Sequence, residues 1–109
     1  MSWKIKYLPE AAKDLKKLSG DQRILVVRAL EKVSQNPLPT QEGGYGKPLG
    51  NKHGKNLTGF LKIKIQDAGI RIVYTLVHTD SSMMIIVIGA RADDEVYNAA
   101  LHRVKKHDC

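Results

Sequence analysis

Residues 60–91 read FLKIKIQDAGIRIVYTLVHTDSSMMIIVIGAR, and this stretch decides the fold. Two runs rich in β-branched residues, 57–66 and 70–77, are separated only by Asp67-Ala68-Gly69, which predicts two strands joined by a tight turn. A polar turn at 78–82 follows. Met83–Ile88 is apolar at every position, which predicts a third strand with both faces covered, as in the centre of a sheet.

Cationic residues stand at the edges of these apolar runs. Lys62 and Lys64 are two positions apart on one predicted strand, so their side chains share a face. Arg71 and Arg91 lie at the ends of the next two runs, and Tyr97 follows soon after. We expect these residues to gather on one side of the sheet. A rigid cationic face with a tyrosine beside it suits a polyanion, and RNA most of all.

The residue pattern of the N-terminal third predicts a strand and two helices. Apolar residues alternate with lysines over 3–7, which is typical of a short half-buried strand. Pro9 suits the first turn of a helix, and Gly20 stops it. Asp21 is expected to cap a second helix, which Pro37 ends. Because the link between the two helices is so short, they should form a helical hairpin.

Residues 40–56 hold five glycines among basic side chains, and we interpret them as a mobile basic loop. Acidic residues at 93–95 favour the start of a last helix, since they complement its dipole. The predicted order is βααβββα. The expected class is α+β, with an N-terminal helical hairpin packed on a small, twisted, mainly antiparallel four-stranded sheet, and a C-terminal helix.

Bulk properties narrow the class of protein. A chain of 109 residues fits one domain spanning 1–109. The net charge of +7 favours nucleic acid or an acidic partner. Cys109 is the only cysteine, so neither an internal disulfide nor a cysteine metal cluster is expected, and a cytoplasmic location fits. The longest apolar run, 83–88, is too short to span a bilayer, so we expect no membrane association.

In this order and spacing, the motifs resemble the RelE/ParE superfamily of bacterial toxins from type II toxin–antitoxin systems, over nearly the whole chain. The helix at 11–18 is similar to the family's N-terminal signature. The segments 60–65 and 68–74 match its second and third strands. Ile88-Gly89-Ala90-Arg91, followed by Tyr97, matches the RelE branch in particular.

The resemblance implies ribosome-dependent cleavage of messenger RNA in the decoding site, with no metal or other cofactor. In RelE-like members the RNA's own 2′-hydroxyl attacks, and a 2′,3′-cyclic phosphate remains. On the matching positions, Lys62 and Lys64 would lie along the scissile phosphate, and Arg71 would stabilise the negative charge of the transition state. Arg91 would support the phosphate or the leaving group. Tyr97 would stack on or orient a base, or help to remove the 2′-proton.

The residue types suit that chemistry. A pentacoordinate phosphorane carries extra negative charge, which cations stabilise more than they stabilise the ground state. The basic loop supplies a further expected electrostatic contact with ribosomal RNA, although a solvated loop without function is the alternative. No histidine accompanies the strand motifs, so a histidine-pair ribonuclease is not expected. The expected RNA-binding residues are Lys47, Lys52, Lys55 and His53.

Each candidate also has a purely structural interpretation. Lys62 and Lys64 are also compatible with the solvated face of an edge strand. Arg71 and Arg91 each have aspartates close in sequence with which to pair. Tyr97 lies on the apolar stripe of the last helix and, by itself, is more often a core residue.

Two other functions are compatible with the same family resemblance. One is a ParE-like inhibitor of DNA gyrase, and the other is an inactive member that only binds an antitoxin. Either toxin hypothesis implies a cognate antitoxin encoded by an adjacent gene. A disordered acidic segment of that antitoxin is expected to cover part of the Lys62–Arg71 surface or to displace the last helix. Ribosome and messenger RNA are the other expected partners.

Overall fold

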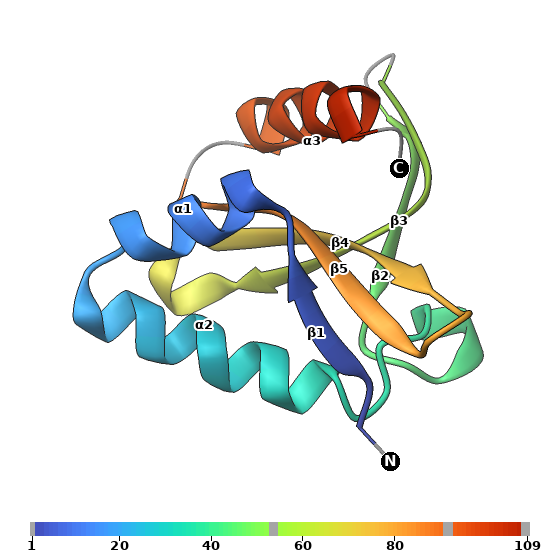
Figure 1. Cartoon of the computed structure of the whole chain (residues 1–109), viewed down its shortest axis with the longest axis horizontal. Helices are drawn as coiled ribbons and strands as arrows, with labels where there is room; N and C mark the ends of the chain where they lie inside the picture. The colour runs from blue at the N-terminus through green and yellow to red at the C-terminus, as the bar shows by residue number, and fades with distance from the viewer. Residues whose placement is uncertain (1, 53–54, 91–92, 108–109) are drawn as a thin grey trace.

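A computed structural model describes residues 2–52, 55–90 and 93–107. The elements follow the order β1 (Lys4–Tyr7), α1 (Pro9–Lys17), α2 (Gly20–Val33), β2 (Lys47–Lys52), β3 (Lys55–Ile65), β4 (Ile70–Val77), β5 (Ser82–Gly89) and α3 (Asp93–His107), as Figure 1 shows. Single 3₁₀ turns lie at Thr40–Glu42 and Gln66–Ala68. The predicted α+β class is confirmed.

The sheet has five strands, not the four that the sequence predicted, in the order β1-β5-β4-β3-β2. Only β1 pairs in parallel, with β5, and the other three pairings are antiparallel. β5 lies between β1 and β4, and its side chains are buried at every position except the half-buried Met84. The prediction that this apolar run forms a covered central strand is therefore confirmed.

The expectation of a loop over 40–56 is wrong for its second half. Residues 47–52 form β2, and the ladder continues into β3, whose first residue is Lys55. A bulge between Pro48 and Gly50 interrupts the register, and Gly50 has a positive φ of 64°. Strand pairing continues on both sides of this bulge. Because proline and glycine usually indicate a loop, the local sequence pattern does not reveal the strand.

The preceding glycine-rich turn is packed into the core. The Tyr74 hydroxyl donates to the carbonyl oxygen of Pro37 at 2.7 Å, and the Tyr74 side chain is fully buried. A Cβ atom at Gly46 would lie 2.2 Å from that hydroxyl, so only glycine fits there. Burial raises the pKa of Tyr74 above its ordinary value of 10.

The helical hairpin is formed by strong local signals. Pro9 occupies the start of α1, as predicted. The cap of α2 is Ser19 rather than the expected Asp21, because Ser19 and Gln22 form a reciprocal capping box. Arg23 then donates three hydrogen bonds, of 3.0 to 3.3 Å, to carbonyl oxygens at the end of α1. This arginine fixes the turn between the two helices.

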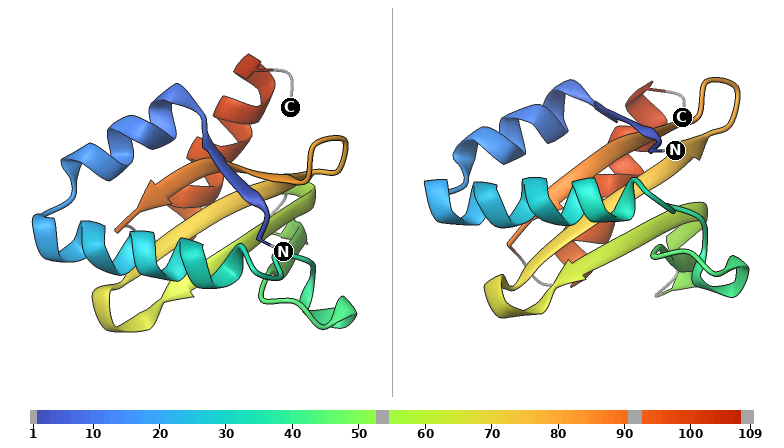
Figure 2. Two further views of the ribbon diagram at one scale, coloured as in Figure 1. Left: turned by 60° about the horizontal axis from the view of Figure 1, so that its bottom comes forward. Right: turned by 90° about the horizontal axis from the view of Figure 1, so that it is seen from below.

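Helices cover both faces of the sheet. α2 and α3 lie on opposite faces, as the two views in Figure 2 show, and α1 lies alongside β5. The core between α2 and the sheet includes Val26 and Leu30, both fully buried, and Val96 and Ala100 line the inner side of α3. No helix in the described ranges is long and apolar enough to cross a membrane.

A buried ion pair ties α1, β5 and α3 together. Arg103 donates two hydrogen bonds to the carboxylate of Asp14, at 2.6 and 3.2 Å, and a third to the carbonyl oxygen of Ile86 at 2.9 Å. Asp14 also accepts the backbone N–H of Ile88 at 3.1 Å. Near the end of α3, Glu10 accepts from His107 at 2.8 Å. These contacts fix how α3 lies across the sheet.

Candidate nucleic-acid interface

Three of the predicted cations share one face of the sheet. Lys64 stands opposite Arg71 in the β3–β4 ladder, and Arg71 stands opposite Gly89 in the β4–β5 ladder. Lys62 is two residues from Lys64 and shares its side of β3. A Cβ atom at Gly89 would lie 3.3 Å from the Val96 side chain, so this is the face that α3 covers.

Lys47 joins the same face from β2. It stands directly opposite Lys62 in the β2–β3 ladder, and opposed residues project to the same side. We call the surface formed by Lys47, Lys62, Lys64 and Arg71 the cationic face. Lys47 was expected on a basic loop, whereas the structure makes it part of the sheet. No local pattern around Pro48 could have shown this, because the position depends on pairing with β3.

The pairing on the cationic face sets like charges against each other. Lys47 opposes Lys62, and Lys64 opposes Arg71. Like charges directly opposite in a sheet are destabilising, by roughly 0.2–1 kcal/mol per pair. At Lys62, β3 lies between β2 and β4, so the alternative that this lysine decorates an edge strand is wrong. The β2–β3 ladder ends at Lys62, so for Lys64 the edge-strand alternative stays open. The opposed Lys47 and Lys62 form a surface that an anion would stabilise.

Tyr97 reaches the cationic face from α3. Its hydroxyl accepts a hydrogen bond from the Lys62 ammonium at 2.9 Å, and the ammonium lies 5.7 Å from the centre of its ring. The Tyr97 side chain is only 2% exposed. Tyr97 is therefore a core residue and, through its hydroxyl, a direct partner of Lys62. In this arrangement the ring offers no free face to a base.

Arg71 is oriented by the turn that precedes β4. Its Nη1 donates to the carbonyl oxygen of Gly69 at 3.3 Å. Gly69 has a positive φ of 64°, a backbone conformation that glycine adopts without strain. The half-buried side chain is thus directed by its own turn as well as by its place opposite Lys64.

The structure does not describe the side chains of the remaining predicted residues. Arg91 and His53 lie outside the described residues. Lys52 and Lys55 face each other at the tip of the β2–β3 ladder, but their side chains are not among those described. Within the described ranges, no three His, Cys, Asp or Glu side chains are grouped as metal ligands.

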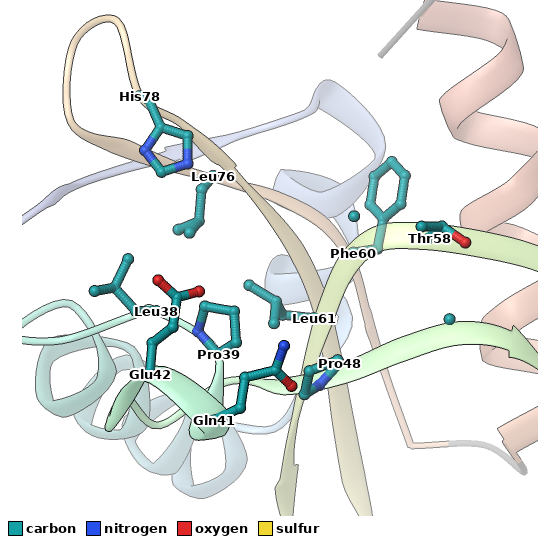
Figure 3. A pocket seen from close by; sticks show the side chains of 12 residues that line it. Leu38, Pro39, Gln41, Glu42, Pro48, Thr58, Phe60, Leu61, Leu76 and His78 are labelled. Atoms are coloured by element: carbon teal, nitrogen blue, oxygen red, sulfur yellow. The ribbon is translucent and has the colours of Figure 1, made fainter.

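A separate hollow of about 580 Å³ lies between the 38–42 segment and the bend of β3. Leu61 and Leu76 contribute to its mainly apolar lining, and Glu42 and His78 are its ionisable groups (Figure 3). Its lining includes no lysine or arginine among the described residues. This hollow therefore lacks the positive charge that a phosphate needs, and the cationic face is the better candidate site.

Comparison with known proteins agrees with this fold. No protein-family model matches the chain. A curated Escherichia coli protein described as RelE-like is 24% identical over 106 residues, covering 96% of this chain and all of that protein. A mutant of E. coli toxin RelE, solved in the free state, superposes with a TM-score of 0.74 at 24% identity, covering 95% of this chain and 99% of that one.

A second solved structure is the RelBE2 toxin–antitoxin complex of Mycobacterium tuberculosis. It matches with a TM-score of 0.67 at 23% identity, over 85% of this chain and 95% of that chain. The chain therefore has the RelE fold. Its sequence is similar to RelE-like toxins across almost its whole length, which confirms the resemblance that its motifs predict.

Proposed function

We propose that this protein is the toxin of a type II toxin–antitoxin system and that it cleaves messenger RNA on the ribosome. The RNA's 2′-hydroxyl attacks the adjacent phosphorus, the bond to the 5′-oxygen of the next nucleotide breaks, and a 2′,3′-cyclic phosphate forms. The similarity to RelE toxins over 96% of the chain supports the class of protein. The cationic face supports the chemistry.

The gathering of Lys47, Lys62, Lys64 and Arg71 on one face, with Lys47 directly opposite Lys62, is the observation on which the proposal depends. Opposed like charges such as Lys47 and Lys62 carry an electrostatic cost in the free protein. A bound phosphate removes that cost, and the phosphorane removes more of it because its charge is greater. The face therefore favours the transition state over the ground state, which is the condition for catalysis.

Each residue then has a role. Lys62 and Lys64 lie along the scissile phosphate, and the planar fork of Arg71 holds two of its oxygens. Tyr97 fixes the Lys62 ammonium through the 2.9 Å hydrogen bond and so acts as a positioning residue. Arg91 supports the phosphate or the leaving group, as the family resemblance implies.

The surface around the cationic face extends the contact with RNA. Lys47 belongs to the face itself, and Lys52, Lys55 and His53 are proposed to continue it along the β2–β3 hairpin toward ribosomal RNA. Such phosphate contacts release counterions, so association with the ribosome should weaken steeply as salt is raised. The protein would act in the cytoplasm, where ribosome and messenger RNA meet.

The second proposed partner is a cognate antitoxin encoded by the adjacent gene. Solved relatives include RelB–RelE complexes from E. coli and from Pyrococcus horikoshii. A basic protein of net charge +7 suits an acidic, largely disordered partner that folds on binding. We expect one of its segments to neutralise the cationic face or to displace α3.

Induced expression with mapping of transcript ends tests the proposed activity. Arg71→Ala and Lys64→Ala should each lower the cleavage rate by roughly 100- to 1000-fold, as is typical when one transition-state donor is removed. Lys13→Ala is the matched control, because it removes one exposed lysine from α1, away from the cationic face. The control should cut as the parent does.

Three outcomes would contradict the proposal. Parental cleavage by the Arg71 and Lys64 variants would show that the site is elsewhere. A DNA-damage response with intact messages would select the gyrase inhibitor. Absence of growth arrest in several hosts, with retained binding to the adjacent gene product, would leave only an antitoxin-binding module.

A further inference from the structure

The hollow between the 38–42 segment and the bend of β3 differs in charge from the rest of the protein. Its volume of about 580 Å³ lies within the range of roughly 300–1,000 Å³ that is typical of small-molecule sites. The chain carries 18 lysines and arginines against 11 acidic residues. Among the described residues that line the hollow, however, the ionisable groups are Glu42 and His78, and there is no lysine or arginine. This local reversal of charge favours a cation over a phosphate or a carboxylate.

The Glu42 carboxylate is available to such a cation. It forms no ion pair or side-chain hydrogen bond with any residue that the structure describes. Figure 3 shows it directed toward the side of the hollow that Leu76 and His78 form. Gln41, next to it in the lining, adds an amide that can donate or accept a hydrogen bond. A carboxylate beside an apolar hollow is a direct partner for an ammonium group.

The wall that carries Glu42 is held in place by the rest of the fold. The backbone N–H of Glu42 donates to the carbonyl oxygen of Pro39 at 2.8 Å, and that of Thr40 donates to the carbonyl oxygen of Gly46, also at 2.8 Å. Gly46 in turn lies against the buried Tyr74 side chain, since a Cβ atom there would be 2.2 Å from the tyrosine hydroxyl. A ligand therefore meets a preformed wall, which lowers the cost of binding because no loop has to be ordered.

The remaining lining of the hollow is mainly apolar. Leucine side chains contribute to it, together with the rings of Pro39, Pro48 and Phe60. We propose that the hollow binds a small organic cation with an aromatic body. The ammonium group of this ligand meets the Glu42 carboxylate, and its ring packs on the apolar lining. This inference goes beyond the toxin function and does not depend on it.

Other cations fit the hollow less well. A metal ion needs several ligands, and within the described ranges no three His, Cys, Asp or Glu side chains are grouped to hold one. A small hydrated cation gains nothing from the apolar lining, whereas an aromatic body removes that lining from water. One carboxylate beside an apolar hollow thus selects an amine that also has an apolar part.

The hollow lies behind the cationic face. Pro48 stands opposite Leu61 in the β2–β3 ladder, in the pair next to Lys47 and Lys62. Successive residues of a strand project to opposite sides of the sheet, so the two lining residues point away from the lysines. A ligand in the hollow therefore contacts the same two strands without touching the proposed catalytic residues, and its binding can be measured independently of message cleavage.

An NMR titration of the parent chain with 2-phenylethylamine, which is protonated at neutral pH, tests this proposal. Two matched probes separate charge from shape: 2-phenylethanol has the same body without the charge, and phenylacetate carries the opposite charge. We expect the amine to bind with a dissociation constant on the order of 1 mM, as suits so small a ligand, and about fivefold more tightly than the alcohol. Phenylacetate should not shift the resonances of the lining residues.

Two variants assign the binding to Glu42. Glu42→Gln keeps the size of the side chain and removes its charge, so it should bind the amine about fivefold more weakly than the parent does and the alcohol equally well. Glu31→Gln is the matched control, because it removes one exposed acid from α2 that does not line the hollow. The control should bind the amine as the parent does.

Trp3 supplies a second readout. It is the only tryptophan of the chain, and its ring meets the His78 ring edge-on with the ring centres 5.7 Å apart. Because His78 lines the hollow, an occupied hollow should change the fluorescence of Trp3. The fluorescence titration should give the same dissociation constant for the amine as the NMR titration.

The results distinguish a cation site from a merely apolar surface. Equal affinity of the parent for the amine and the alcohol would overturn the proposal, because the hollow would then not select a cation. Parental affinity for the amine in Glu42→Gln would overturn it too, as would an amine that shifts no lining residue. None of these results bears on message cleavage, so the toxin function is tested separately.

Discussion

Replacing Asp14 with alanine should be among the most damaging single changes in this protein. The Asp14 side chain is 7% exposed and accepts three hydrogen bonds, two from Arg103 and one from the backbone N–H of Ile88. Alanine removes all three. Among the described residues, the Arg103 side chain, 13% exposed, then keeps only the carbonyl oxygen of Ile86 as a hydrogen-bond partner, and a buried N–H of β5 loses its acceptor.

The expected cost follows from this geometry. Removing one partner of a buried ion pair typically costs about 3–5 kcal/mol, because the remaining charge stays buried without compensation. Arg103 keeps one hydrogen bond and some contact with solvent, so we expect the lower end, about 3 kcal/mol. Small domains have a total stability of about 5–15 kcal/mol. The urea midpoint should therefore fall by on the order of 1–3 M.

Equilibrium urea unfolding measures this cost, and a double variant supplies the control. Asp14→Ala combined with Arg103→Met also removes the stranded guanidinium, so it should recover more than about 1 kcal/mol relative to Asp14→Ala alone. A loss below about 1 kcal/mol in Asp14→Ala, or a double variant less stable than the single one, would refute the reasoning.

Three further changes test other contacts. Tyr97→Phe removes the hydrogen bond with Lys62 and should cost only about 1 kcal/mol of unfolding free energy while lowering message cleavage more than tenfold; parental cleavage would exclude its positioning role. Tyr74→Phe leaves the Pro37 carbonyl without its donor and should cost about 1–2 kcal/mol in urea unfolding; an unchanged midpoint would contradict this. The third change is Glu10→Gln. A hydrogen bond from its own backbone N–H and, to a smaller extent, one from His107 lower the pKa of the Glu10 carboxyl from 4.5 to about 2. Since the folded pKa is the lower one, its contribution is complete above about pH 4.5 and is lost as pH falls toward 2, so stability should fall less over this window in Glu10→Gln than in the parent.

Local patterns predicted much of the fold because their signals are local in origin. The alternation over 3–7 predicted β1, the runs rich in β-branched residues and the apolar run at 83–88 predicted β3, β4 and β5, and Pro9 marked the start of α1. The capping box of Ser19 with Gln22 was also present in the sequence, although Asp21 was the expected cap. These features depend on neighbours within a few residues, which is why a single sequence reveals them.

The candidate site was predicted only in part. Lys62 and Lys64 had to share a face, because they are two positions apart on one strand. That Arg71 stands opposite Lys64, and Lys47 opposite Lys62, depends on strand register. Register across the Pro48–Gly50 bulge comes from long-range pairing, and no local pattern records it.

The amino-acid sequence by itself determined the identity of every element except β2, the surplus of positive charge and the resemblance to RelE-like toxins, since all three follow from residue type and spacing. Only the tertiary structure decided that residues 47–52 complete the sheet and that Tyr97 is buried while it contacts Lys62. The reason is physical: the partners in those contacts lie up to 35 positions apart in the chain and meet only when the sheet and α3 pack together.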